Sequence, residues 1–469
     1  MPSPSTGADL EGQLRSALTE AVGRGRETLV SATVPFDCAD PVATVFSSRR
    51  AGEPFFCWEQ PDRDIRLGAL GRVREVNSRG DGRFLEVAAE CAHLSGDAVL
   101  VGSGGFTTGP VWTGGFSFHE EGTAGGRAPD SSWSSFEPAS MILPELSIQS
   151  SESETNLTVN LIVGPGSDPD RLLAAALARV AGLIENEPPM LDPHPAVAPT
   201  IESVLSPESY ESSVAAAVER IKAGEIEKVV LAREVVVRAG SAHDPFAIFD
   251  ALRQGFPACF NFCVGTGEAA FIGASPELLV RCAGRGVATV GLAGSTRRSS
   301  DPAVDDHLAQ KLLGSDKDRG EQAVVVRRIV KTLSRISVWV EAADEPEIIK
   351  VANIQHLGTP VYAQLAQPRT AIELAGLLHP TPAVGGEPWK KAGRVMAEVE
   401  EMDRGWYAGP VGWMDGSGDG EFCVALRSAL LRDREAHLYA GVGVVTDSDP
   451  AAELAETEIK LGALLPLLS

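Results

Sequence analysis

The alternation of hydrophobic and polar positions is clearest in the second half of the chain. Residues 228–238, KVVLAREVVVR, alternate at a period of two, which predicts a strand with Val229 and Leu231 on one face. Residues 244–255 have helical periodicity instead, and Asp244 followed by proline is a typical helix start. Both kinds of secondary structure are therefore expected close together in the chain.

Similar patterns recur along the whole sequence. Helices are predicted over Ala8–Val22, Pro169–Glu185, 206–223 (ending before Gly224), 316–336 and after 447–450. Short apolar strands, several of them broken by glycine, are predicted within 98–106, 114–118, 155–164, 271–281 and 287–295. The proline-rich, polar stretch 185–200 is the best candidate for a connection between two halves.

Strands interspersed with helices predict an α+β fold with α/β-like layers, in which helices flank large mixed or antiparallel sheets. We expect residues 1–24 to form an N-terminal, partly helical segment and 25–200 a strand-rich part of the same fold. Residues 203–469 have the clearer pattern of helices and strands and are expected to contain the functional site.

The composition narrows the class of protein. The 469 residues are 43% hydrophobic and 22% charged, which is ordinary for a globular protein. No apolar run approaches the roughly 18 residues of a membrane span, and the N-terminus lacks a secretory pattern, so a cytoplasmic enzyme is expected. A net charge of −23 disfavours nucleic-acid binding. An anionic substrate would need a bound metal or inward-facing arginines.

The seven cysteines do not predict a disulfide framework or a zinc site, because they form no CxxC pair. Cys259 and Cys263 lie in CFNFCVG, which is typical of a buried strand where cysteine acts as a small apolar residue. The glycine-rich segments match no nucleotide-binding loop, and no GxSxG motif occurs. Gly441 and Gly443 in GVGVV could bring backbone N–H groups close to an anion, or simply allow tight strand packing.

Two helices carry paired carboxylates. Asp318 and Glu321 are three residues apart, as are Glu453 and Glu456, so each pair can share a helix face. Two such pairs facing each other would supply the oxygen ligands that Mg²⁺ prefers. The plainer interpretation is that acidic residues favour the first turns of helices.

Lys228 and Glu277 are candidates for proton transfer. A lysine desolvated in a cavity has a lowered pKa and can act as a base, whereas a buried glutamate stays protonated and can act as an acid. Lys228 opens an apolar strand, and Glu277 lies between a Ser-Pro turn and an apolar run. Each could equally be a half-buried charge with a structural partner.

Ten motifs occur in an order that resembles the chorismate-utilising enzymes of menaquinone, siderophore and tryptophan biosynthesis. The resemblance is clear over 203–469 and looser before it, where GGFSF and SSFEPASMILPEL are also similar. The motifs are KVVLARE (228–234), FIGASPELLVR (271–281), LAGSTRR (292–298), DKDRGE (316–321), NIQHLGTPV (353–361), LHPTPAVGG (378–386), RGWYAGPVGW (404–413), GDGEFCVALRS (418–428), AGVGVVTDSDP (440–450) and ELAETEIK (453–460).

The resemblance implies a magnesium site and a chorismate site. Glu321 and Glu456 match direct Mg²⁺ ligands, and Asp318 and Glu453 match ligands that act through water; some relatives have glutamate at position 318. The metal would hold the C1 carboxylate of chorismate. The residues implied to contact the substrate are Arg427 and Tyr407 at the enolpyruvyl carboxylate, the backbone of Gly441 and Gly443, Lys460 near the metal, His356 and Ala383 as wall residues of the pocket, and in addition Gly294 and Ser295.

The same resemblance favours the isochorismate-forming branch of the family. Lys228 would activate water to attack C2, and Glu277, 49 residues later, would protonate the departing C4 hydroxyl. Anthranilate synthases have glutamine in place of this lysine, and aminodeoxychorismate synthases keep a lysine but differ in the glycine-serine segment. Salicylate synthases tend to have threonine at position 383.

Three alternatives stay open from the sequence. The first is a salicylate synthase, which eliminates pyruvate after forming isochorismate. The second is an amidotransferase-dependent synthase component, and the third is a catalytically silent acidic binding protein. In each case the expected ligand is a small molecule, with neither nucleic acid nor membrane as a partner, and the chain is expected to be a monomer.

Overall fold

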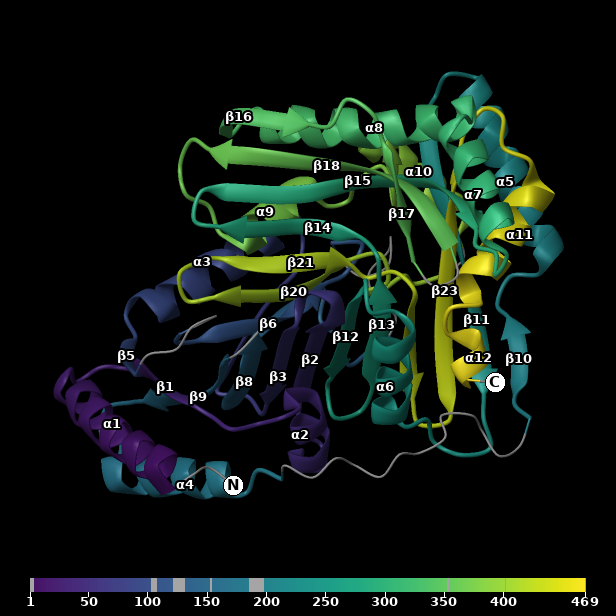
Figure 1. Cartoon of the computed structure of the whole chain (residues 1–469). Coiled ribbons are helices and arrows are strands. Elements are labelled where there is room, and N and C mark those ends of the chain that lie inside the picture. The colour runs from purple at the N-terminus through teal and green to yellow at the C-terminus, as the bar shows by residue number, and fades with distance from the viewer. Residues whose placement is uncertain are drawn as a thin grey trace.

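Two large β-sheets with flanking helices make up the computed structural model of the protein (Figure 1). It describes residues 4–102, 108–120, 131–151, 154–184, 198–351, 354–400 and 402–468. Among the described strands every pairing is antiparallel except β1–β5, which is parallel. The predicted class, helices flanking mixed or antiparallel sheets, is confirmed.

The larger sheet, here sheet A, has 13 strands. Its order is β10 (Thr200–Ser203), β11 (Lys228–Arg238), β23 (Glu435–Val444), β22 (Ser428–Arg432), β13 (Ala270–Ser275), β12 (Phe260–Gly265), β2 (Phe55–Gln60), β3 (Ile65–Leu70), β8 (Leu146–Ser151), β9 (Glu154–Val163), β1 (Thr28–Pro35) and β5 (Val99–Gly102), with β19 (Gly386–Glu387) paired to β11.

The smaller sheet, here sheet B, has ten strands. Its order is β16 (Ser337–Ala342), β18 (Ile354–Leu365), β15 (Gly286–Arg297), β14 (Leu278–Ala283), β21 (Gly420–Val424), β20 (Pro410–Asp415), β6 (Val111–Phe116), β7 (Ala139–Leu143) and β4 (Arg74–Ser78), with β17 (Glu347–Lys350) paired to β18.

Both sheets combine strands from before and after residue 200. In sheet A, Cys263 of β12 lies opposite Cys57 of β2, and in sheet B Gly412 of β20 lies opposite Gly114 of β6. All seven cysteines are buried, and Cys263 packs in the apolar core as expected.

The helices pack on the sheets as the amphipathic patterns require. α8 lies along β15, β18 and β16 of sheet B, and α11 packs on β23 and α5 (Figure 1). Their bounds are α1 (Pro4–Gly23), α2 (Pro41–Ser48), α3 (Arg83–Gly96), α4 (Pro169–Ala181), α5 (Pro207–Lys222), α6 (Pro245–Gly255), α7 (Pro302–Leu313), α8 (Asp316–Leu333), α9 (Ala371–Leu378), α10 (Trp389–Val399), α11 (Pro450–Leu461) and α12 (Leu465–Leu468). In the described part of the chain no helix is long and apolar enough to cross a membrane.

The predicted helix signals are present. Asp244 caps α6 by accepting hydrogen bonds from the N–H groups of Phe246 and Ala247, and Gly224 after α5 has φ +73°. The helices expected to end at 185 and 336 stop earlier, at Ala181 and Leu333. Residues 185–197 of the predicted connection and 103–107 of one predicted strand lie outside the described residues.

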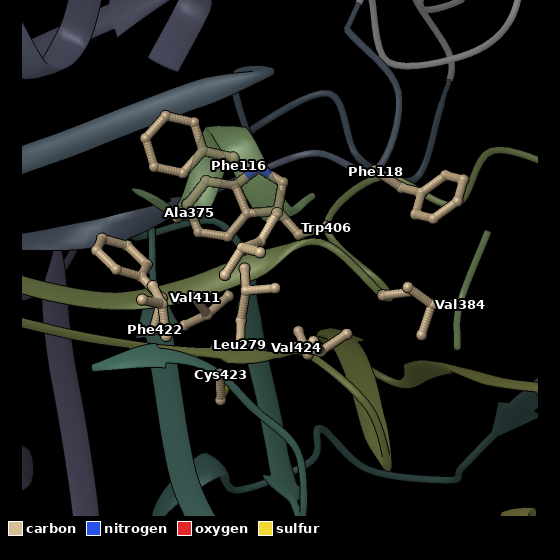
Figure 2. Close-up of a cluster of buried hydrophobic side chains, with 14 of the residues drawn as sticks. Phe116, Phe118, Leu279, Ala375, Val384, Trp406, Val411, Phe422, Cys423 and Val424 are labelled. Atoms are coloured by element: carbon tan, nitrogen blue, oxygen red, sulfur yellow. The ribbon is translucent and has the colours of Figure 1, made fainter. Parts of the chain in front are cut away.

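An apolar cluster packs against sheet B next to the segment that carries Tyr407. The indole of Trp406 packs among side chains of β6, β14, β20 and β21, as Figure 2 shows. A Cβ on Gly115 would lie 2.7 Å from this indole, so the strand position must be glycine. Tyr407 is the next residue in the chain, so the packing of Trp406 in the core also fixes the backbone position of Tyr407.

Candidate active site

One pocket collects the predicted site residues. It is a partly enclosed pocket of mixed polar and apolar lining. It is lined by the ends of β15 and β23, by α8 and α11, and by the segments around Ala383, Tyr407 and Arg427. Every predicted site residue except Lys228 lines it, namely Glu277, Gly294, Ser295, Asp318, Glu321, His356, Ala383, Tyr407, Arg427, Gly441, Gly443, Glu453, Glu456 and Lys460.

Lys228 lies directly behind this lining. It is fully buried at the start of β11, and its Nζ lies 2.7 Å from Oε1 of Glu321. The contact lacks hydrogen-bond geometry, and Nζ has no hydrogen-bond partner among the described residues. A Cβ on Gly443 would lie 2.9 Å from Cε of Lys228 and 2.1 Å from the Glu321 carboxylate. Gly443 therefore leaves the space in which this pair meets.

Glu277 follows the Ser-Pro turn that ends β13. Its N–H donates to Oγ of Ser275 (3.2 Å), which orients the turn. Burial raises the pKa of Glu277 to about 8, although the cations Lys228 and Arg427 oppose the rise. The side chain is therefore protonated at neutral pH and carries a proton that it can donate.

Three glutamates of the pocket are each paired with a lysine. Besides the Glu321–Lys228 pair, Glu456 lies 2.7 Å from Lys460 and Glu453 lies 2.8 Å from Lys317. Within the described residues no three acidic, histidine or cysteine side chains form a metal cage. The donors still fit Mg²⁺ chemically, because four carboxylates line one wall and supply only oxygen.

The titration of these carboxylates reflects their partners. Burial opposes the ionisation of Glu456, but Lys460 and Ser295, whose Oγ donates to Glu456 over 2.6 Å, outweigh it, so its pKa falls to about 2. Burial instead dominates at Asp318 and Glu453 and raises their pKa values.

The opposite end of the pocket contains Arg427, a cation for which the described residues show no carboxylate partner. Nη2 of Arg427 lies 3.2 Å from Nε2 of His356, whose Nδ1 lies 3.3 Å from the carbonyl oxygen of Gly294. Burial, together with Arg427, lowers the pKa of His356 to about 3, so the ring is neutral. A neutral ring protonated at Nδ1 donates to Gly294 and accepts from Arg427. Nε of Arg427 is buried with no partner in the described structure.

Tyr407 completes this end. Its ring stacks on Tyr439 with centroids 5.2 Å apart, and burial raises its pKa to about 12, so the phenol keeps its proton. Arg427 has φ +49° and Ala408, beside Tyr407, has φ +61°. Non-glycine residues rarely hold this left-handed conformation, and strain of this kind gathers at functional sites.

The backbone of β23 also faces the pocket. Gly441 and Gly443 lie opposite Ala232 and Val230 of β11, whose N–H groups donate away from β23, to Glu400 and Gly385. These are therefore non-hydrogen-bonded pairs, and the N–H groups of both glycines point away from β11. The Gly441 carbonyl on the same edge accepts from Nζ of Lys460 (2.8 Å). Contacts from these N–H groups to an anion stay a prediction.

The residue-level analysis of the sequence missed two cations in the pocket, Lys317 and Arg404. Both lie inside motifs quoted for the resemblance, DKDRGE and RGWYAGPVGW. Lys317 is paired with Glu453 and Arg404 with Glu400, so neither adds an uncompensated positive charge to the pocket.

Comparisons with known proteins agree with this geometry. Residues 16–469 match the family described as "Chorismate binding enzyme". The salicylate biosynthesis isochorismate synthase of Pseudomonas aeruginosa is 35% identical over 463 residues, 98% of this chain and 94% of that protein. Isochorismate synthase MenF of Bacillus subtilis is 32% identical over 463 residues, 96% of each. The chain therefore belongs to the chorismate binding enzyme family.

Solved structures share the fold. The menaquinone-specific isochorismate synthase MenF from Escherichia coli matches with a TM-score of 0.80 at 24% identity, over 97% of this chain and 100% of that one. Anthranilate synthase component I from Streptococcus pneumoniae matches with a TM-score of 0.70 at 21% identity, over 87% and 92%. The architecture is thus shared with an isochorismate synthase and with an anthranilate synthase component, and at these identities the likeness shows the fold alone.

Proposed function

We propose that the chain is an isochorismate synthase, a Mg²⁺-dependent isomerase that converts chorismate to isochorismate. The observation that carries the proposal is the meeting of a buried lysine and a protonated glutamic acid at one pocket. Among the cations that lower the pKa of Glu277, Lys228 has the largest effect, so the two groups lie within electrostatic range of each other. A lysine at this position favours water activation over amination.

Lys228 and Glu277 perform the proton transfers. To act as a base, Lys228 must leave its charged contact with Glu321 and present a free amine; the amine then takes a proton from the water that attacks C2 of chorismate, and the ring double bonds shift as the C4–O bond breaks. Glu277 gives its proton to the departing hydroxyl, which leaves as water. One water enters and one leaves, so the net reaction is an isomerisation. General base and acid groups of this kind each contribute about 10²–10⁴-fold in rate.

The two ends of the pocket hold the two carboxylates of the substrate. Arg427, Tyr407 and the N–H groups of Gly441 and Gly443 bind the enolpyruvyl carboxylate, for which a guanidinium fork is well suited. Glu321 and Glu456, with Asp318 and Glu453 through water, would hold Mg²⁺. When bound, the metal would neutralise the ring carboxylate. The cytoplasmic location and the monomeric state stay predictions from the sequence.

The experiment is a product analysis. The purified chain is incubated with chorismate and Mg²⁺, and products are resolved by liquid chromatography and mass spectrometry. Isochorismate alone is expected, because Ala383 and Val384 present small apolar groups to the pocket. Salicylate with pyruvate would identify the salicylate synthase instead. An enzyme that needs ammonia for any turnover would overturn the proposal.

A further inference from the structure

The middle of β11 lacks a strand partner on one edge. On that edge β10 pairs with residues 235–238 and β19 with 228–229. Between them Val230 and Ala232 direct their backbone groups away from β23. The N–H of Val230 donates to the carbonyl of Gly385 (2.8 Å), and at the far end of the gap the carbonyl of Glu234 accepts from the N–H of Val204 (3.0 Å). Lys228 lies two residues before this gap and pairs with Glu387 of β19, so the gap begins just after the residue that carries the base.

A buried ion pair fills the gap. Nη2 of Arg404 donates to the Val230 carbonyl (3.0 Å), and Oε1 of Glu400 accepts from the Ala232 N–H (2.7 Å). The two side chains are bound to each other through Nε of Arg404 and Oε2 of Glu400 (2.9 Å), and they are 1% and 5% exposed. Together they take the place of a neighbouring strand at this point of sheet A.

The same guanidinium reaches the wall of the pocket. Nη1 of Arg404 donates to the Val384 carbonyl (2.9 Å), and the group stacks over Phe118 at 4.2 Å from the ring centroid. The carbonyl of Arg404 accepts from the N–H of Tyr407 (2.8 Å). Arg404 thus touches the strand of the base, the Ala383–Val384 wall, the Tyr407 segment and a residue of the N-terminal half.

We propose that Arg404, held by Glu400, is a positioning residue that fixes Lys228 against the Ala383–Val384 wall of the pocket. The role rests on the proposed function, because it acts through the base of that reaction. A guanidinium can make these contacts at once, since its donors form a planar fork, whereas an ammonium group is a single point with no such plane.

The consequence for the reaction is specific. The contact to Tyr407 uses the backbone of Arg404 and survives substitution of its side chain, so the carboxylate clamp stays in place. The contacts to Val230 and Val384 use the side chain and are lost. A misplacement of about 1 Å can cost on the order of 10²-fold in rate. We therefore expect loss of kcat with little change in KM.

The test compares Arg404→Lys and Glu400→Gln with the matched control Arg179→Lys. Arg179 is also a buried arginine, 4% exposed, that binds two carboxylates, Glu53 and Glu145, and it does not line the pocket. Melting temperatures report the structural cost of each substitution. Steady-state kinetics with chorismate and product chromatography report on positioning.

Arg404→Lys is expected to lower kcat on the order of 10²-fold with KM nearly unchanged, and to release side products as the wall loosens. Glu400→Gln is expected to lower kcat less, because its amide oxygen still accepts from Ala232. Arg179→Lys is expected to lower the melting temperature by about as much as Arg404→Lys does, and to leave kcat unchanged. If Arg404→Lys fails to fold, Glu400→Gln against the control decides.

Two outcomes would overturn the role and are distinguishable. In the first, the wild type is active, but kcat falls no further in the Arg404 and Glu400 variants than in Arg179→Lys. This result refutes the positioning role alone. A wild type that does not turn over chorismate refutes the proposed function and this role with it.

Discussion

The two ends of the pocket differ in how the charges of their side chains are balanced. At the carboxylate end, Glu321, Glu453 and Glu456 are each neutralised by a lysine within 2.8 Å. At the arginine end, Arg427 contacts a neutral histidine, and one of its buried donors has no partner in the part of the chain that the structure describes. A buried cation without a carboxylate is costly unless a ligand supplies one. The arginine end therefore suits an anion, whereas the charges at the carboxylate end are already balanced by lysines.

The largest effect is expected from substitution of Lys228, which pairs with Glu321 at the carboxylate end and is the proposed general base. Lys228→Met should lower kcat about 10³-fold, because the water loses its base, while chorismate still binds. Steady-state kinetics and calorimetric binding measure the two quantities. Lys222→Met, which removes a half-exposed lysine paired with Glu219, is the control. Near-normal turnover in Lys228→Met would exclude it as the base.

The next effect concerns the arginine end alone. Arg427→Lys should raise KM on the order of 10²-fold, because the loss of charged hydrogen bonds worth about 3 kcal/mol weakens the hold on the carboxylate. The kcat should change much less, since Lys228 and Glu277 are untouched. Arg285→Lys is the control, because Arg285 binds only backbone carbonyls near Leu365. A fall in kcat at constant KM would contradict the assignment of Arg427 to binding.

The pH dependence tests the protonated glutamate between the two ends. Glu277 must carry a proton to act as the acid, and its pKa is about 8. We expect kcat/KM to fall about tenfold for each pH unit above that value. The raised pKa also means that ionisation costs stability, so the contribution of Glu277 to folding is full below about pH 4.5 and lost as the pH rises through 8.

Glu277→Gln separates these two effects. The variant should be inactive, and its stability relative to the wild type should improve between pH 5 and pH 8, the window in which the wild-type carboxyl resists ionisation. Urea unfolding at several pH values measures this. A stability difference independent of pH would show that the carboxyl is not held protonated.

The smallest expected shift is the gain in melting temperature when a metal ion binds at the carboxylate end, although turnover as a whole should depend on the ion. EDTA should abolish turnover and Mg²⁺ restore it. At 100 times its Kd the ion should also stabilise the fold by about 2.7 kcal/mol, which for a chain of this length corresponds to about 3 °C in melting temperature. Glu321→Gln should lose this thermal shift. A wild type whose melting temperature ignores Mg²⁺ would count against the site.

Local patterns in the sequence predicted most of the elements. The period of two over 228–238, the Asp-Pro start of α6 and the spacing of the helical carboxylates depend on neighbours a few residues away, and all three are present as predicted. The order of the strands could not be predicted this way. β12 pairs with β2 and β20 with β6, and nothing in either partner encodes the other.

The sequence by itself determined which residue types are available to the site and on which elements they stand. The tertiary structure alone decided how they are paired. Lys317 meets Glu453 across 136 residues, and Ser295 meets Glu456 across 161. The neutrality of His356, the raised pKa of Glu277 and the bracing of β11 by Arg404 all depend on burial and on charges brought in from distant segments. Such effects exist only once the two sheets have closed over the pocket, because desolvation has no counterpart along an extended chain.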